Sequence, residues 1–211
     1  MGEGERPGAW LGSVGLDPAA LDGFGGVDTR TVVDALFAGI DPGKKGHIAL
    51  IDEAGVRETW EMPTVGKTYD LGGVARIAHT LAARGVLHVT LDRQQPAYNR
   101  GKAAANNSFT KASFGIGYGY ALWQMALFMA HVPHSVVLPA VWKRVMGVLV
   151  PSSVKGTKER QKAAKEQSVG ACQTIYPDVD LRRNDRCRVA CPDKAEAILL
   201  ARYGLLNARA A

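Results

Sequence analysis

The stretch that decides the fold is Leu36–Ile51, which reads LFAGIDPGKKGHIALI. An apolar run ends in a single carboxylate, Asp41, and a Pro-Gly-Lys-Lys-Gly turn leads into a second apolar run. This pattern predicts a β-hairpin with strands over residues 35–41 and 47–52. An acid at the end of a buried strand is costly unless it has a partner or a function. Asp41 is therefore either a turn-capping residue, the usual role of an isolated Asp-Pro-Gly, or a metal ligand that faces outward from the sheet edge.

The composition is that of one globular domain. The chain has 211 residues, of which 46% are hydrophobic and 22% charged, and it has no apolar run of about 18 residues that would predict a membrane helix. Residues 1–34 are Gly-rich and acidic, without the pattern of a signal or transit peptide, and we expect a loosely ordered extension there. We expect the main domain over residues 35–207. Three cysteines are too few for a disulfide framework or a zinc site, which favours a reducing cytoplasm.

Positive charge is concentrated in the middle of the chain. The net charge is +6, but residues 93–165 hold eleven bases against Glu159 alone, which gives +10. Residues 1–37 hold six acids and two bases, which gives −4. A basic block in a folded sequence favours a polyanionic partner, most simply nucleic acid, over a merely solvated surface.

Hydrophobic periodicity extends the hairpin into an α/β pattern. The further expected elements are a strand over 56–61, a helix over 70–84, a strand over 86–91 closed by Asp92, a long polar loop over 93–113, a helix over 113–130, a strand over 134–138, a short helix over 140–146, a basic helix over 158–175, a charged loop over 178–188 and a final helix over 193–207. His47 is expected on a strand surface. Gly115, Gly117 and Gly119 do not form a phosphate loop, and we expect them to let a helix or a DNA backbone come close.

Four acids form the candidate site. Asp193 and Glu196 are three residues apart, so on a helix they share one face with Cβ atoms about 5–6 Å apart. Both lie in the first helical turn, where capping alone would explain carboxylates. Together with Asp41 and Asp92, they are predicted to bind two Mg²⁺ ions, or Mn²⁺, both of which prefer oxygen ligands. Two such ions about 3.5–4 Å apart activate a water molecule and stabilise the leaving oxygen of a phosphodiester.

In strand order and acid placement the sequence resembles the ribonuclease-H-like nucleases, and its motifs resemble those of the RuvC-type Holliday junction resolvases. Gly-Ile-Asp-Pro-Gly-x-x-Gly around Asp41 is similar to the family's first motif, and Asp92 followed by Gln94 stands where the family usually has Glu-Gln. Residues 114–123, 139–143 and 195–204 are most similar to the plant-chloroplast and phage-type branch. The resemblance spans residues 35–206 and leaves the extension unexplained.

The resemblance implies an α/β, ribonuclease-H-like fold with a central mixed five-stranded sheet flanked by helices. It also implies a Mg²⁺-dependent endonuclease, encoded by a bacterium or phage, that resolves four-way DNA junctions by paired symmetric nicks. It further implies a homodimer paired through the helix that follows the long loop. Two departures leave a reduced or altered activity open: Asp92 replaces the usual Glu, and Glu196 stands where bacterial members have Asp.

The resemblance also implies roles for basic residues. Lys143 and Lys158 stand where family members have lysines near the scissile phosphate, and we assign a catalytic role to Lys158. The alternative for both is general binding of the DNA backbone. The residues expected to contact DNA are Lys44, Lys45, Arg93, Arg100, Lys102, Lys111, Trp142, Lys143, Arg144, Lys155, Arg160 and Lys162.

Two other classes of protein share parts of this pattern. One is a junction- or nucleic-acid-binding protein of the same fold that has lost cleavage. The other is a sugar-kinase or actin-like ATPase, whose first phosphate loop also follows a strand. Such ATPases need a duplicated domain with a second Asp-x-Gly loop, and the absence of that repeat from 211 residues argues against them.

Overall fold

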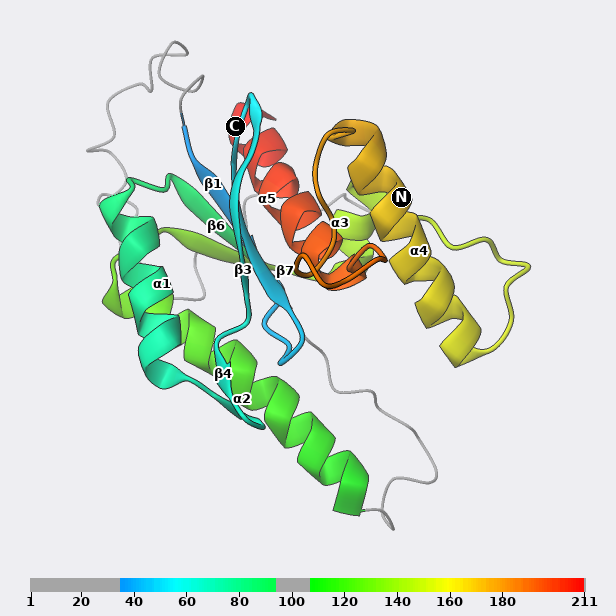
Figure 1. Ribbon diagram of the computed structural model, residues 1–211, viewed down its shortest axis with the longest axis horizontal. Helices are drawn as coiled ribbons and strands as arrows, with labels where there is room; N and C mark the ends of the chain where they lie inside the picture. The colour runs from blue at the N-terminus through cyan, green and yellow to red at the C-terminus, as the bar shows by residue number, and fades with distance from the viewer. Residues whose placement is uncertain (1–34, 94–106, 211) are drawn as a thin grey trace, which may run out of the picture. The chain divides into compact units, whose positions relative to one another are not determined.

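A mixed five-stranded sheet forms the centre of the described domain (Figure 1). The computed structural model describes residues 35–93 and 107–210, with side chains in the second segment from residue 114 onward. The strands are β1 (Phe37–Ile40), β2 (His47–Asp52), β3 (Gly55–Glu61), β6 (His88–Asp92) and β7 (His134–Val137), in the spatial order β3-β2-β1-β6-β7. Strands β1, β2 and β3 are antiparallel neighbours, whereas β1, β6 and β7 run parallel. The predicted mixed five-stranded sheet is confirmed.

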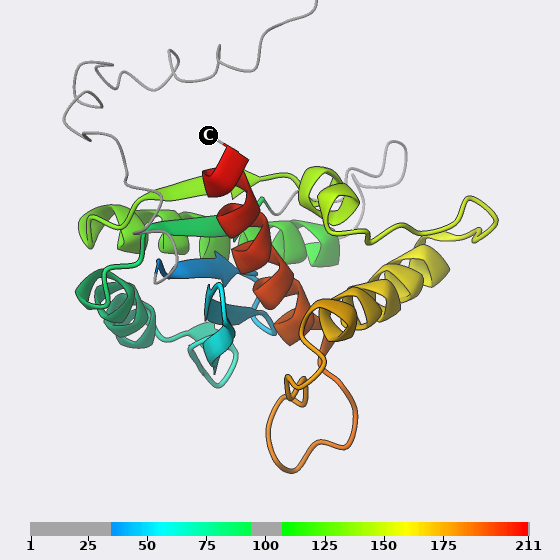
Figure 2. The same ribbon diagram turned by 90° about the horizontal axis from the view of Figure 1, so that it is seen from above.

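Helices cover both faces of this sheet (Figures 1 and 2). One face carries α1 (Leu71–Ala83) and α2 (Asn107–Met129). The other carries α5 (Pro192–Ala210), with α3 (Pro139–Val145) and α4 (Thr157–Ile175) packed beside it. A two-stranded hairpin, β4 (Thr64–Val65) with β5 (Thr68–Tyr69), precedes α1. Two-residue strands are too short for periodicity to reveal, so the sequence did not predict this hairpin.

Side chains of β1 and β2 point alternately to the two faces of the sheet, and each face contributes to a separate hydrophobic core. Ala38, Ile40 and Leu50 pack with α1 and α2, while Phe37 and Ile51 pack with α3, α4 and α5. Successive strand residues point to opposite faces, and both faces are covered here, so all six residues of β2 are buried. His47, the first of them, is 1% exposed, and the prediction of a surface histidine was wrong for this reason.

Gly39, in the middle of β1, determines how closely α5 approaches the sheet. A Cβ atom at this position would overlap the carbonyl oxygen of Ala197 and the amide nitrogen of Ala201, one turn apart on α5. The small side chains of α5 and the absence of one at Gly39 therefore bring helix and strand into direct backbone contact. This contact carries the first turn of α5 to the end of β1.

Two further boundaries differ from expectation. Helix α2 begins at Asn107, so the predicted loop over 93–113 ends earlier than expected. The first residues of α2 are polar and then rich in Gly, and they therefore show no helical hydrophobic period. Helix α5 continues to Ala210, three residues past the predicted end. The predicted extension over residues 1–34 and most of the loop lie outside the described residues. Among the described helices, none is long and apolar enough to cross a membrane.

Candidate metal centre

Two of the four predicted acids meet because β1 and β6 are parallel neighbours. Ile40 of β1 pairs with Leu91 of β6, so the residues that follow them, Asp41 and Asp92, reach the same edge of the sheet. The backbone N–H of Asp41 donates to the carbonyl of His47 at 3.0 Å, which closes the hairpin around the turn. The carboxyl ends of parallel strands are a common place for functional groups in α/β proteins.

Helix α5 brings the other two acids to this edge. Carboxylate oxygens of Asp41, Asp193 and Glu196 all lie within 4.8 Å of one another, so one cation could contact all three. Asp92 lies outside that group but is also buried, and its charge acts on Asp41. The structure therefore brings all four predicted ligands to one place, with three of them in the tightest arrangement.

Burial and repulsion between carboxylates raise the pKa values of Asp41 and Asp92, the two acids at the strand ends. Burial raises the pKa of Asp41 to about 7, and Glu196, Asp92 and Asp193 add to the rise, while a hydrogen bond from the Gly43 amide (3.2 Å) opposes it. Burial likewise raises the pKa of Asp92 to about 6, assisted by Glu196. Carboxylates packed together in a buried site favour either protonation or a bound cation. An all-oxygen donor set of this kind fits Mg²⁺ or Mn²⁺.

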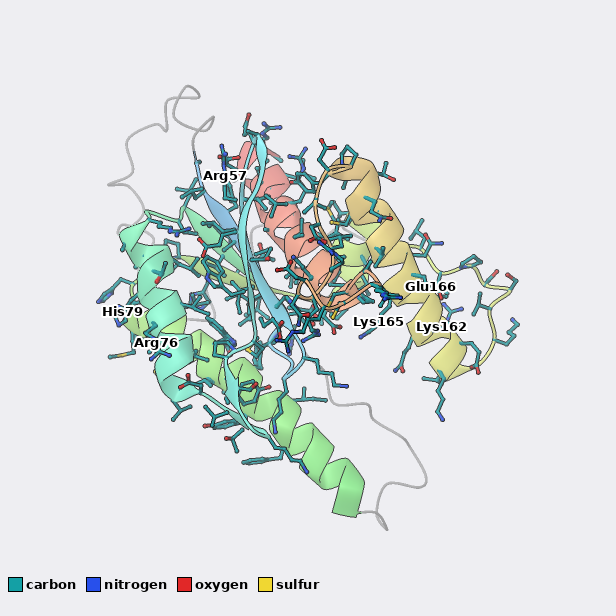
Figure 3. The ribbon with its side chains drawn as sticks, viewed as in Figure 1. Arg57, Arg76, His79, Lys162, Lys165 and Glu166 are labelled. Atoms are coloured by element: carbon teal, nitrogen blue, oxygen red, sulfur yellow. The ribbon has the colours of Figure 1, made fainter. Side chains whose placement is uncertain are left out.

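Two lysines neutralise the helix acids. Lys165 Nζ lies 2.7 Å from Asp193 Oδ1, and Lys143 Nζ lies 2.7 Å from Glu196 Oε1. The hydroxyl of Ser168 donates to the same Glu196 oxygen at 3.1 Å. Although burial favours a neutral Lys165, its hydrogen bond to Asp193 and the nearby acids raise its pKa, so it stays charged. Figure 3 shows Lys165 extending from α4 toward the beginning of α5.

Lys165 was missed by the sequence reasoning, which assigned the catalytic role to Lys158. Lys158 is exposed near the start of α4, seven residues and thus about 10 Å along the helix axis from Lys165. Lys165 and Ser168 are three residues apart on the side of α4 that faces α5, and this spacing was the available signal. The role of Lys158 stays a prediction, but the lysine of α4 that contacts a predicted metal ligand is Lys165.

Trp142 was predicted to contact DNA, and the structure places it elsewhere. Its side chain is fully buried, and its indole N–H donates to Asp92 Oδ1 at 2.9 Å. The hydrogen bond stabilises the charged carboxylate and lowers the pKa of Asp92 against the effect of burial. Trp142 is followed by Lys143 and Arg144 in the sequence, but α3 turns Trp142 into the core and Lys143 toward Glu196.

The other predicted DNA contacts lie mainly on the surface. The exposed ones are Lys44, Lys45, Arg93, Arg144, Lys155, Arg160 and Lys162, whereas Lys143 is half-buried. Arg160 donates to backbone carbonyls of the preceding loop, and Lys162 pairs with Glu166 along α4 (Figure 3). Arg100 and Lys102 lie outside the described residues, and of Lys111 only the helical backbone is described.

The turn after Asp41 packs against α2 and β5. The Tyr69 hydroxyl donates to the carbonyl of Pro42 at 2.9 Å, and a Cβ atom at Gly119 would lie 2.7 Å from that same carbonyl oxygen. A close approach does occur at Gly119, but the groups that approach it are the turn and the side chain of Tyr69, not the helix or DNA backbone that was predicted. Gly115 and Gly117 face open space.

Two solved structures similar to this chain are of RuvC from Thermus thermophilus. RuvC of T. thermophilus in complex with a Holliday junction substrate is 20% identical, with a TM-score of 0.52, and the match covers 83% of this chain and 96% of that one. A second Thermus thermophilus RuvC structure is 17% identical with a TM-score of 0.48, covering 82% and 96%. No protein-family model matches the sequence, and comparison with curated proteins gives no match. The likeness to the first structure confirms the predicted ribonuclease-H-like fold, and the branch assignment stays a prediction.

Proposed function

We propose that this protein is a divalent-metal-dependent endonuclease that resolves four-way DNA junctions by paired symmetric nicks. The observation that carries the proposal is the cluster of Asp41, Asp193 and Glu196 oxygens within 4.8 Å, with Asp92 buried beside it. The likeness in fold to a RuvC bound to a Holliday junction supports the choice of DNA structure. The three described cysteines are free thiols, which fits the reducing cytoplasm expected from the sequence.

The four acids would hold two Mg²⁺ ions, or Mn²⁺ in their place. Such ions supply Lewis-acid stabilisation of phosphate oxygens and a deprotonated water at neutral pH. The protein's own residues orient the site: Trp142 fixes one oxygen of Asp92, and Ser168 fixes one oxygen of Glu196. Lys143 and Lys165 are partly exposed at the rim of the cluster, where their ammonium groups also face an approaching phosphate.

The surface around the cluster supports binding of a DNA backbone. Lys44 and Lys45 lie in the turn after Asp41, and the basic helix α4 reaches the acids through the ion pair of Lys165 with Asp193. Contacts of this kind fix the register of DNA without reading its sequence. The proposal therefore assigns these residues to positioning the junction.

We also propose that two copies pair through α2. Phe114, Tyr118, Met125 and Phe128 are between 42% and 74% exposed, although all are large apolar or aromatic side chains. Their spacing of four, seven and three residues places them on one face of the helix. Exposed apolar patches of this kind mark interaction surfaces. We expect Phe128→Glu to convert a dimer to a monomer in light scattering, and Val65→Glu, at an exposed apolar site on β4, to leave the dimer intact.

The test of function is a cleavage assay on a labelled synthetic four-way junction, with linear duplex and flap DNA as controls. The proposal predicts paired symmetric nicks in the junction with Mg²⁺ or Mn²⁺, and none with chelator. Equal cutting of linear duplex would contradict junction specificity. Binding of the junction without any cleavage in either metal would favour the alternative, a non-catalytic junction-binding protein; the shorter Asp92 in place of the family's usual Glu is the observation behind it.

A further inference from the structure

The loop between α4 and α5 (orange in Figure 2) supplies a side chain that the proposed mechanism does not use, Arg183. An antiparallel bridge between Arg182 and Ala190 closes this loop at its base. Arg183 lies next to that bridge, and its Nη2 donates to the carbonyl of Lys45 at 2.9 Å. Lys45 belongs to the turn that follows Asp41, so the loop reaches back to the opposite side of the acid cluster.

Arg183 contacts four residues from three segments of the chain: the turn after Asp41, the end of β3 and the start of α5. Besides Lys45, its Nη2 lies 3.4 Å from Asp193 Oδ2 and 3.5 Å from the sulfur of Cys191. Its Nη1 lies 3.4 Å from the Glu61 carboxylate at the end of β3. The contact with Lys45 is the shortest, and the others are longer polar contacts that surround the same guanidinium group. One side chain thus joins the catalytic turn, β3, the residue before α5 and a predicted metal ligand.

The partners of Arg183 differ from those of its neighbour. Arg183 is 28% exposed and its donors face the protein, whereas Arg182 is 46% exposed and pairs with Asp180 on the surface. A planar guanidinium group presents several donors in fixed directions, so it can bridge a carbonyl and a carboxylate at once. A lysine ammonium has the same charge but no such fork.

We propose that Arg183 is a positioning residue. By bridging the Lys45 carbonyl and the Asp193 carboxylate, it fixes the beginning of α5 against the turn and so sets the spacing between Asp41 and Asp193. This inference rests on the proposed function, because it concerns the same acids. A purely electrostatic role makes the opposite prediction, since a cation beside the ligands repels a metal ion and its removal would tighten metal binding.

The test is a calorimetric titration of Mn²⁺ into the full chain without DNA. Arg183→Lys keeps the charge and loses the fork, and we expect Mn²⁺ to bind about tenfold more weakly, as is typical when a residue that orients a metal ligand is changed. Arg182→Lys, the matched change one residue away, is expected to leave the affinity within about twofold. Binding of a four-way junction in chelator should be the same for both variants, because neither loses charge.

The outcomes separate this inference from the proposed function. If wild type binds no Mn²⁺, the metal centre itself is absent. If wild type binds Mn²⁺ and Arg183→Lys binds it equally well, the positioning role is overturned while the metal centre stands. A larger loss of junction affinity in chelator for Arg183→Lys than for Arg182→Lys would make Arg183 a DNA contact instead. Arg183→Gln provides a second variant if the lysine variant does not fold, and tighter Mn²⁺ binding by it would overturn the proposal.

Discussion

Asp41 and Asp92 stand at the ends of adjacent parallel strands, whereas Asp193, in the first turn of α5, and Glu196, in the second, reach the same point from the helix. The strand-end pair is fixed by sheet register and held in a buried setting that raises the pKa of both acids. The helix pair is fixed by the close packing of α5 on Gly39, and each member is neutralised by a lysine. The two pairs thus differ in how their charge is compensated: the raised pKa values mark Asp41 and Asp92 as the acids that a cation would stabilise most, whereas each helix acid already forms an ion pair with a lysine.

The largest expected effect comes from a strand-end acid. Asp41→Asn should reduce junction cleavage by about a thousandfold or more, which corresponds to about 4 kcal/mol in the activation barrier. The reason is that Asp41 would bind the same metal ion as Asp193 and Glu196. Junction binding in chelator should be unchanged or slightly tighter, since one negative charge is lost. Gel-shift and cleavage assays on the same junction measure the two effects. Parallel loss of binding and cleavage would show that Asp41 has a structural role instead.

The next effect concerns the contact that positions the helix pair. Gly39→Ala places a methyl group against the backbone of α5, and we expect it to lower the free energy of unfolding by about 2–3 kcal/mol. Cleavage should fall as well, because the start of α5 moves away from Asp41. Gly170→Ala, at an open position inside α4, is the matched control and should be neutral or stabilising by up to about 1 kcal/mol. Denaturant unfolding compares the two, and equal stability would refute close packing at Gly39.

The sequence and the structure point to different lysines of α4: the sequence assigned the catalytic role to Lys158, whereas the structure places Lys165 on Asp193. We expect Lys165→Ala to reduce cleavage about a hundredfold, because it removes the cation bound to Asp193, and Lys158→Ala to reduce it only a few fold. Single-turnover cleavage with saturating junction separates this effect from weaker binding. The reverse order of effects would restore Lys158 to the catalytic role predicted from the sequence.

The smallest expected effect is on stability in chelator. The pKa of Asp41 is raised from 3.8 to about 7, so the folded state binds more protons than the unfolded state between these values, and this carboxyl makes folding less favourable as pH rises through that range. Asp41→Asn should therefore be more stable than wild type at pH 8, on the order of 2 kcal/mol, with the difference vanishing near pH 4.

The effect of Asp41 is measured as the difference between wild type and Asp41→Asn, because buried His47 changes the stability of both proteins with pH in the opposite direction. Burial, followed by the charge of Arg183, lowers its pKa to about 4, so its contribution to stability is present above pH 6.5 and is lost as pH falls toward 4.

Asp193→Asn supplies the contrast between the two acid pairs. It leaves Lys165 without its partner and should destabilise the protein by about 1 kcal/mol at pH 8. Stabilisation by both variants would remove the distinction between strand and helix acids.

Sequence reasoning reached the hairpin around Asp41, the separate strands and the four acids because each left a local pattern, whereas the mixed five-stranded sheet was implied by the resemblance to ribonuclease-H-like nucleases. Buried strands read as apolar runs, and acids that end such runs or share a helical turn are visible in one dimension. The partners of those acids were not visible. Trp142 lies between Val141 and Lys143 in a basic segment, and only the packing of α3 shows that its indole reaches Asp92. Lys165 and Arg183 were two cations among many until the fold placed them on Asp193.

The measurement that tests the central claim most directly is a titration of Mn²⁺ into wild type and Asp41→Asn, by calorimetry at pH 8 without DNA. If the acids at the ends of β1 and β6 and at the start of α5 form a metal centre, wild type binds Mn²⁺ and Asp41→Asn binds it at least about tenfold more weakly. Equal binding by the two proteins, or no binding by wild type, would contradict the account.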